Sequence, residues 1–336
     1  MMMANGGFFM ADLTHRDIQA NGINIHCVAA GDGPLVILCH GFPESWYSWR
    51  HQLPILADAG YRAIALDMRG YGGTSQPEMI SSYNLSKIIG DVVSVVNALD
   101  EKQAVVVGHD WGGPVAWYSA LMRPDIFRAV AVLSVPYNPP MQVPEELILT
   151  KMMAENAGEK EYYRSYFQEP GIAELDLEAD IRHSMLGFFY SVSGDIVKDR
   201  IRSIGWDGHF PKGESMSSLM PIPNELPHWL TQEDLDHYVK AFQSSGFRGG
   251  LNWYRNIDSL PGILAPFIGT TINQPALYMY GEHDLIGGND EISVQSMRTT
   301  LPNLTEIIKM EGAGHWLQQE RPEEVNEQLL KFLAGL

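Results

Sequence analysis

The sequence predicts an α/β fold: a mostly parallel, eight-stranded sheet with helices on both faces and an inserted helical segment. Short, nearly continuous apolar runs alternate with longer segments of helical spacing, which is typical of parallel strands covered by helices on both faces. This alternation stops near residue 137 and resumes near residue 271. We therefore expect a first part of the core (residues 1–137), a helical cap (138–271) and a second part of the core (272–336).

The elements of the expected core follow one another in a regular order. The chain opens on a hairpin, because Asn21-Gly22 favours the positive φ angles of a tight turn between Leu13–Ala20 and Ile23–Ala30. Apolar runs then predict the strands Leu35–Cys39, Tyr61–Leu66, Ala104–Val107, Ala129–Val135, Ala276–Tyr280 and Thr305–Met310. Helical spacing predicts the helices Trp46–Ala59, Leu85–Leu99, Gly112–Met122, Glu291–Thr300 and Trp316–Ala334.

Composition and charge exclude several classes of function. The 336 residues carry a formal net charge of −18, and such a surface repels nucleic acid and anionic lipid headgroups. No apolar run reaches the roughly 18 residues of a membrane span, and the apolar leader Met1–Met10 lacks the basic flank of a secretory signal. Cys27 and Cys39 fall in predicted strands, so we interpret them as buried free thiols of a cytoplasmic protein.

The most specific motif is Val107-Gly108-His109-Asp110-Trp111-Gly112-Gly113, which follows a predicted strand and opens a predicted helix. Its spacing is that of the nucleophile elbow G-x-S-x-G of the α/β-hydrolase fold, with Asp110 in the serine position. Glycine is needed because a Cβ would clash in so sharp a turn. A helix-capping aspartate is the simpler interpretation, but the flanking glycines favour a catalytic one.

Aspartate as the nucleophile predicts a particular chemistry. A carboxyl group with a pKa near ~4 is already ionised at pH 7 and needs no base to activate it. It suits displacement at an sp³ carbon, as in an epoxide or an alkyl halide, and leaves an alkyl ester on the enzyme. A histidine can then activate the water that hydrolyses this ester.

The acid and the histidine are expected after later strands. Asp284 follows the strand Ala276–Tyr280 and His315 follows Thr305–Met310, in the chain order nucleophile, acid, histidine. We assign Asp284 as the orienting acid and His315 as the base. Glu282 is a rival acid and His283 a rival base, and position in the chain does not exclude either.

One further turn predicts an oxyanion hole. His40-Gly41-Phe42-Pro43 follows the strand Leu35–Cys39. We assign the backbone N–H groups of Phe42 and Trp111 to the oxyanion that forms when water attacks the ester. His40 and His109 are interpreted as structural, and no histidine pair has the spacing of metal ligands.

Taken together, these motifs resemble the soluble epoxide hydrolases. The resemblance runs from about residue 14 to residue 335, and its quoted segments are His40–Trp46, Gly108–Gly113, Tyr163–Gly171 and Leu251–Asn256. It implies that two cap tyrosines, Tyr163 and Tyr254, hydrogen-bond the epoxide oxygen and protonate it as the ring opens. Tyr162 and Tyr166 are alternatives to Tyr163. The product implied is a vicinal diol, formed without cofactor or metal.

Other functions remain to be weighed against this one. A haloalkane dehalogenase shares the fold and the aspartate, but Phe42 stands where a halide-binding asparagine is typical. A fluoroacetate dehalogenase would carry arginine in place of Trp111, and a carboxylesterase would carry serine at position 110. A non-catalytic binding protein is the remaining class. We expect a small apolar epoxide as the substrate, with the oligomeric state open and a homodimer as one candidate.

Overall fold

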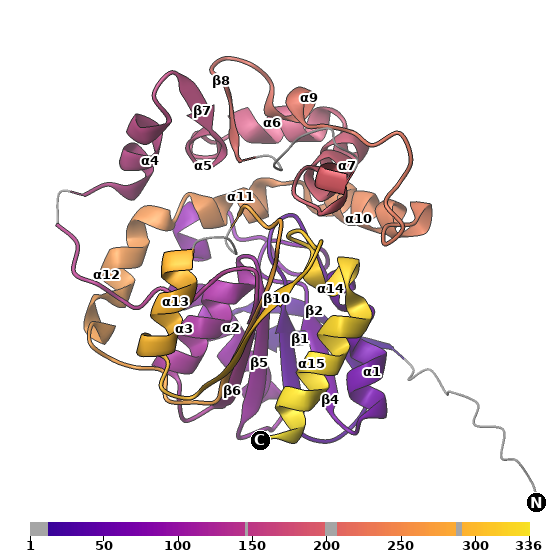
Figure 1. The fold of residues 1–336 in the computed structure, drawn as a ribbon, viewed down its shortest axis with the longest axis vertical. Helices are drawn as coiled ribbons and strands as arrows, with labels where there is room; N and C mark the ends of the chain where they lie inside the picture. Colours follow the sequence, from indigo (N-terminus) through magenta and orange to yellow (C-terminus); the bar gives the residue numbers. More distant parts are fainter. Residues whose placement is uncertain (1–12, 145–146, 199–206, 287–290) are drawn as a thin grey trace, which may run out of the picture.

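The computed structural model describes residues 13–144, 147–198, 207–286 and 291–336, and Figure 1 shows its ribbon. The apolar leader Met1–Met10 lies outside these ranges. The large sheet has eight strands in the order β1-β2-β4-β3-β5-β6-β9-β10. The strands are β1 (Thr14–Ala20), β2 (Ile23–Ala30), β3 (Leu35–Cys39), β4 (Arg62–Leu66), β5 (Ala104–His109), β6 (Phe127–Leu133), β9 (Ala276–Gly281) and β10 (Leu304–Met310).

The strand pairing confirms the predicted fold class. β1 pairs with β2 and β2 with β4 in antiparallel fashion, while the other neighbours in the sheet are parallel. The predicted hairpin is present, with Asn21 at φ 49° and Gly22 at φ 76° in its turn. Parallel strands end at the same edge of the sheet, so the turns after β3, β5, β9 and β10 come together there.

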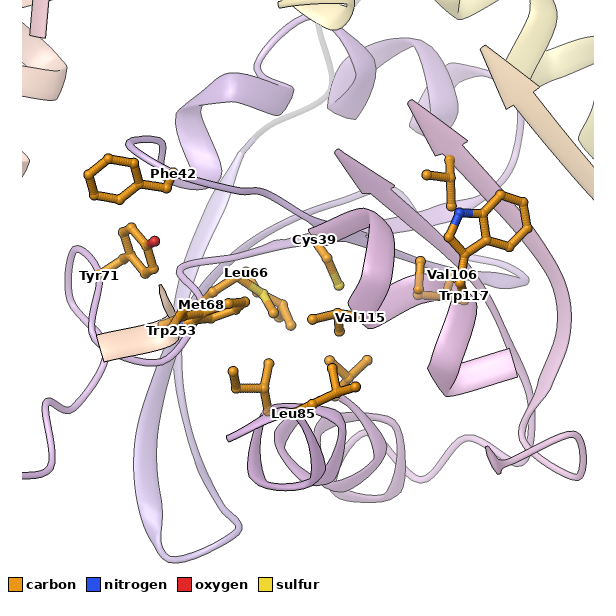
Figure 2. Packing of buried hydrophobic residues seen from close by; sticks show 14 of the residues in the cluster. Cys39, Phe42, Leu66, Met68, Tyr71, Leu85, Val106, Val115, Trp117 and Trp253 are labelled. Atoms are coloured by element: carbon orange, nitrogen blue, oxygen red, sulfur yellow. The ribbon is translucent and has the colours of Figure 1, made fainter. Parts of the chain in front are cut away.

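Each face of the sheet is covered by helices. Successive side chains of a strand point to opposite faces: in β3, Val36 and Leu38 pack toward α1 (Gln52–Asp58) and α15 (Pro322–Ala334). Ile37 and Cys39 belong to the other cluster, with α2 (Leu85–Ala98) and α3 (Gly112–Met122). Figure 2 shows part of this second cluster, where Cys39, Leu66 and Val106 face Val115 and Trp117 of α3.

Proline divides one predicted helix into two. The segment Trp46–Ala59 consists of a 3-10 helix, Trp46–Trp49, and of α1, which begins at Gln52. Pro54 has no N–H to donate to the carbonyl of Arg50, and its ring would clash with that carbonyl in a continuous helix. It is tolerated in the first turn of α1, where no such bond is needed.

The predicted C-terminal helix is also divided, into α14 (Leu317–Glu320) and α15. The residue before a proline is kept out of the helical region, and Arg321 before Pro322 has φ −136° and ψ 55°. The predicted ends of two strands were less accurate: β5 continues to His109, and β6 is shifted two residues toward the N-terminus.

The segment between β6 and β9 crosses over the edge of the sheet where the parallel strands end (Figure 1). A small antiparallel sheet of β7 (Lys160–Tyr162) and β8 (His209–Pro211) lies within it. Helices and loops with little strand signal were expected here, because three residues are too few to show the two-residue period of a strand. Its helices are α4 (Leu149–Ala157), α5 (Tyr163–Tyr166), α6 (Ile172–Ala179), α7 (Ile181–Ser191), α8 (Asp195–Lys198), α9 (Met216–Leu219), α10 (Gln232–Ser245), α11 (Arg248–Tyr254) and α12 (Leu260–Leu264).

One further helix, α13 (Glu291–Thr300), connects β9 to β10. None of the helices in the described part of the chain combines the length and the apolar character that a membrane span requires.

Candidate active site

Asp110 occupies a sharp turn between β5 and α3. Its φ angle is +49°, a region that residues other than glycine rarely adopt and that is common at functional sites. A Cβ on Gly108 would lie 1.9 Å from the carbonyl oxygen of Gly112, and one on Gly112 would lie 2.0 Å from the carbonyl oxygen of Cys39. The two glycines therefore allow the close approach of β3, β5 and α3 that holds Asp110 above the sheet.

The carboxylate of Asp110 is almost fully buried, with 7% of the residue exposed. The backbone N–H of Phe42 donates to its Oδ1 at 2.7 Å. Burial alone would raise the pKa of Asp110, but the hydrogen bond and the charge of His315 outweigh it and hold the pKa below its usual value. Asp110 is therefore an anion at neutral pH, as a nucleophile requires.

His315 lies between two carboxylates. Its Nε2 is 3.5 Å from Asp110 Oδ2, and its Nδ1 is 3.0 Å from Asp284 Oδ1. Burial would lower the pKa of His315, but the charges and hydrogen bonds of Asp284 and Asp110 raise it to about 10. The backbone N–H of Ile286 also donates to Asp284 Oδ1 at 2.9 Å. Asp110, His315 and Asp284 thus form one buried row of charges.

The two rival residues take no part in this row. Glu282 faces the surface, where its Oε2 accepts the N–H of Gly312 at 3.0 Å and its Oε1 lies 3.5 Å from Lys309 Nζ. His283 is half-buried beside it. Of the acids and histidines that sequence analysis proposed, Asp284 and His315 are the pair that the fold brings to Asp110.

Tyr163 and Tyr254 line a cavity together with Asp110. Tyr163 begins α5 and Tyr254 ends α11, and their ring centroids are 5.9 Å apart. Both are buried, with 6% and 3% of the residue exposed. Both line the same cavity as Asp110 and His315. Two phenols, a carboxylate and an imidazole therefore meet in one small space.

The alternative tyrosines have other partners. The Tyr162 ring stacks on that of His209, with 4.8 Å between centroids. The hydroxyl of Tyr166 donates to Asp176 Oδ2 at 3.1 Å. Neither residue lines the cavity at Asp110, so Tyr163 is the member of this segment whose placement fits the prediction.

Two cavities have Asp110 in their walls. The smaller, of about 30 Å³, lies on the side of Phe42 and His315. The larger, of about 280 Å³, lies on the side of Trp111. Asp110, Tyr163, Tyr254 and Ile286 line both. Most of the other residues that line the larger cavity are apolar: Pro114, Val135, Leu149, Met153, Ile257 and Leu260.

Comparisons with known proteins agree in family. The family model for the alpha/beta hydrolase fold matches residues 34–322. Epoxide hydrolase A of Mycobacterium tuberculosis is 42% identical over 96% of this chain and 98% of that protein. Epoxide hydrolase 1 of Siraitia grosvenorii is 37% identical over 96% of this chain and 99% of its own. A solved epoxide hydrolase from an endophytic Streptomyces superposes with a TM-score of 0.90, at 44% identity and 96% coverage of both chains.

The chain belongs to the epoxide hydrolase family.

Family membership decides between the functions weighed above. The resemblance to epoxide hydrolases is confirmed, and haloalkane dehalogenase is not favoured. Aspartate at position 110 distinguishes this epoxide hydrolase from a serine-dependent carboxylesterase. Within the described ranges, no three His, Cys, Asp or Glu side chains gather as metal ligands would.

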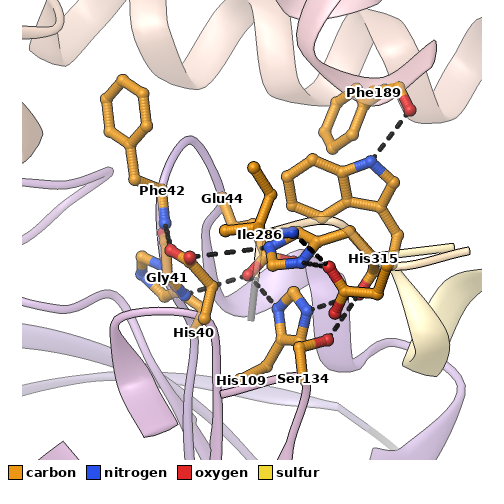
Figure 3. A network of polar contacts seen from close by, with 12 residues as sticks. His40, Gly41, Phe42, Glu44, His109, Ser134, Phe189, Ile286 and His315 are labelled. Carbon is orange, nitrogen blue, oxygen red and sulfur yellow. Dashed lines mark hydrogen bonds and ion pairs between the residues drawn. The ribbon is translucent and has the colours of Figure 1, made fainter. Parts of the chain in front are cut away.

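One group of residues that supports the active site of this epoxide hydrolase was not predicted from the sequence. Figure 3 shows His109 between Glu44 and the backbone of His315. His109 Nδ1 is 2.7 Å from Glu44 Oε2, and its Nε2 is 2.8 Å from the carbonyl oxygen of His315. Glu44 Oε2 also accepts the N–H of Gly41 at 2.9 Å. Glu44 stands within the quoted His40–Trp46 motif, so its place in that motif was the available signal.

His40 has a structural environment, as the sequence interpretation expected. Its Nε2 accepts the N–H of Met68 at 3.0 Å and its Nδ1 donates to the carbonyl oxygen of Gly41 at 2.8 Å. This assignment requires one N–H and one lone pair, which is the neutral imidazole. Burial accordingly lowers the pKa of His40.

Proposed function

We propose that this epoxide hydrolase opens a small apolar epoxide through an alkyl ester on Asp110 and releases a vicinal diol. The observation that carries the proposal is the convergence of an anionic carboxylate, two buried phenols and a histidine–aspartate pair on one cavity. Each group matches one step of the chemistry. No cofactor takes part in the proposed steps.

In the first step, Asp110 Oδ2 attacks an epoxide carbon. The new carbon–oxygen bond forms as the ring carbon–oxygen bond breaks, and the electron pair of the broken bond moves to the ring oxygen. Tyr163 and Tyr254 hydrogen-bond this oxygen, and one phenol transfers its proton to it. A phenol suits this role because it is neutral at pH 7 but acidic enough to protonate an alkoxide.

In the second step, His315 deprotonates a water that attacks the ester carbon. The ester carbonyl oxygen is Oδ1, which already accepts the Phe42 N–H at 2.7 Å. Negative charge grows on this oxygen in the transition state, so Phe42 stabilises it, and we assign the N–H of Trp111 as the second donor. One proton of the water ends on the diol, the other returns to the phenolate, and Asp110 is restored as a carboxylate.

The charge on Asp110 determines when His315 can act as a base. In the free enzyme, Asp110 and Asp284 together raise the pKa of His315, so the imidazole is protonated and cannot act as a base. Ester formation neutralises Asp110 and removes one of these two anions. The pKa of His315 then falls, and the base becomes available only when there is an ester to hydrolyse.

The unequal cavities favour an epoxide with one substituent. The cavity of about 280 Å³ has mostly apolar walls and accommodates an alkyl or aryl group. The cavity of about 30 Å³ has room for little more than a water molecule. We therefore propose terminal epoxides, of which styrene oxide is an example, as the preferred class.

Residues 138–271 are the proposed cap, which contributes both phenols and much of the apolar wall. The core of residues 1–137 and 272–336 contributes Asp110, Asp284 and His315. Cys27 and Cys39 are free and buried, and burial raises the pKa of each thiol to about 12. Such unpaired thiols support the cytoplasm as the proposed compartment. A homodimer remains the proposed assembly to test.

The experiment combines two assays. Wild-type protein is given styrene oxide and 1-bromobutane in parallel, while diol formation and halide release are followed. We expect diol without halide, and halide without diol would reverse the proposal. In His315→Gln, we expect the intact protein to gain the mass of one styrene oxide molecule. Continued turnover without this adduct would contradict the ester intermediate.

A further inference from the structure

Arg164 is a cation in the wall of the catalytic cavity, directly after Tyr163 in the chain. Its Nε donates a hydrogen bond to the hydroxyl oxygen of Tyr163 at 2.8 Å. Its guanidinium carbon also lies 5.5 Å from the centroid of the Tyr163 ring. Within the described ranges no carboxylate pairs with Arg164, and it lines the larger cavity with Asp110. The charge of Arg164 is therefore directed at a phenol rather than at an acid.

The hydrogen bond from Arg164 fixes the direction of proton transfer. A guanidinium has only donors, so Arg164 occupies a lone pair of the Tyr163 oxygen and cannot accept its hydrogen. The hydroxyl hydrogen of Tyr163 is consequently directed away from Arg164. A substrate oxygen bound above Asp110 lies within the cavity that Tyr163 lines.

The charge of Arg164 also favours loss of the proton. Burial raises the pKa of Tyr163, and the charge and hydrogen bond of Arg164 lower it against that trend. When the proton leaves, the neutral hydrogen bond becomes a bond between guanidinium and phenolate, and such charge-assisted bonds are about twice as strong. Arg164 therefore stabilises the transition state of proton transfer more than the neutral phenol. Only such a difference accelerates the reaction.

Tyr254 has only part of this support, because the hydrogen bond of Arg164 Nε goes to Tyr163. No hydrogen bond to its hydroxyl oxygen is present among the described residues, and its ring makes T-shaped contacts with the rings of Phe42, Trp111 and Phe167. Burial, with Tyr163 and Asp110 nearby, raises the pKa of Tyr254 well above its ordinary value, although the charge of Arg164 acts in the opposite direction. Tyr254 can orient the epoxide by a hydrogen bond, but its phenolate would have no comparable partner.

We propose that Arg164 is a positioning residue that makes Tyr163 the proton donor in ring opening and leaves Tyr254 to orient the epoxide. The proposal rests on the proposed function, because it divides the work of the two phenols in the first step. As Asp110 bonds to carbon, the ring oxygen takes the electron pair of the broken bond and then the proton of Tyr163. The resulting phenolate is held by Arg164 until ester hydrolysis returns a proton.

The test measures ester formation alone. All variants carry His315→Gln, so that the ester accumulates, and rapid-quench mass spectrometry follows its formation with styrene oxide. We expect Arg164→Gln to slow this rate by about tenfold at saturating substrate. Arg164→Lys should restore part of the rate, because an ammonium keeps the charge but not the guanidinium geometry.

A double-mutant cycle separates this role from a structural one. Once Tyr163→Phe has removed the phenol, Arg164→Gln should cause no further loss. In a Tyr254→Phe background, it should cause the same tenfold loss as before. Equal losses in both backgrounds, or no loss in either, would overturn the proposal.

The same assay distinguishes failure of this proposal from failure of the proposed function. If the His315→Gln parent forms no ester, the two-step function itself is wrong. If the ester forms and Arg164→Gln leaves its rate unchanged, only the role of Arg164 is wrong. A loss confined to the anionic epoxide 3-phenylglycidate, with styrene oxide unaffected, would also overturn the proposal, because Arg164 would then act on substrate charge.

Discussion

Glu44 and His109 form a fully buried hydrogen-bonded pair beneath the nucleophile, with 2.7 Å between Glu44 Oε2 and His109 Nδ1. This pair joins three turns of the site. Glu44 holds the Gly41 N–H of the turn after β3, His109 belongs to the elbow, and its Nε2 contacts the carbonyl oxygen of His315. A Cβ at Gly41 would lie 2.2 Å from Asp110 Oδ1, so these turns pack too closely to accept a side chain at position 41.

Neutralising Glu44 should therefore cost stability and activity together. Glu44→Gln leaves His109 beside a neutral amide, and removal of one partner from a buried pair costs roughly 3 kcal/mol or more. We expect a loss of that size in the free energy of unfolding, measured by urea denaturation. Glu306→Gln, at an exposed pair with Lys331, is the control and should change stability little. An unchanged unfolding free energy in Glu44→Gln would contradict this account.

The pKa of His315 should depend on the charge of Asp110. Asp110→Asn imitates the neutral ester, and it removes one of the two anions that raise the pKa of His315 to about 10. We expect the pKa to be lower in this variant than in the wild type. An NMR titration of the imidazole resonances, assigned with His315→Gln, measures it. The same pKa in both proteins would mean that ester formation does not release the base.

The same raised pKa predicts how stability depends on pH. A histidine with a raised pKa in the folded state contributes stability below its unfolded pKa of about 6.5 and loses this contribution as pH rises through the folded pKa. The wild type should accordingly lose stability relative to His315→Gln between pH 6.5 and about 10. The unfolding free energy of both proteins is measured across this range. In the difference between them, the contributions of most other titrating groups cancel. A constant difference would show that His315 is not stabilised as a cation.

Gln168 couples the two helices that carry the candidate tyrosines. Its Nε2 donates to the carbonyl oxygen of Arg164 at 2.7 Å and to that of Tyr254 at 3.2 Å. Gln168→Leu keeps the approximate size but removes both bonds, so the spacing of the phenols becomes less defined. A loss of about 1.4 kcal/mol in the transition state would slow ester formation about tenfold.

The chain offers a matched control for Gln168. Gln274 Nε2 also donates to two carbonyl oxygens, those of Ala120 and Phe127, but in the core. Gln274→Leu should lower stability while the rate of ester formation in the folded protein stays near that of the wild type. Equal effects of both variants on that rate would show that Gln168 has no special role.

The nucleophile elbow could be predicted from the sequence because the residues that define it are close together in the chain. Gly108, Asp110 and Gly112 stand within five residues, and their spacing follows from the geometry of one turn. The choice of Tyr163 over Tyr162 and Tyr166 was not local. It depends on the pairing of β7 with β8, which are about fifty residues apart, and on partners such as His209 and Asp176.

The contacts of the polar residues that support the site could not be predicted from the sequence either. Glu44, Arg164 and Gln168 stand inside the quoted motifs, but the motifs alone do not show which groups these side chains contact. Some partners are close in the chain, such as Tyr163 for Arg164, but His109 for Glu44 and Tyr254 for Gln168 are distant and are brought near by the folded core. The helix breaks at Pro54 and Pro322, by contrast, follow from the missing N–H of proline and were available from the sequence.

Substrate size should be limited by the larger cavity. Met153 lines it, whereas the neighbouring Met152 is 38% exposed and does not. Met153→Trp should fill part of the apolar wall and reduce kcat/KM for styrene oxide, while the smaller 1,2-epoxypropane should be turned over nearly as before. Met152→Trp adds the same ring outside the cavity and should leave both substrates unaffected. If Met153→Trp slowed both epoxides equally, the larger cavity would not be the binding site of the substituent.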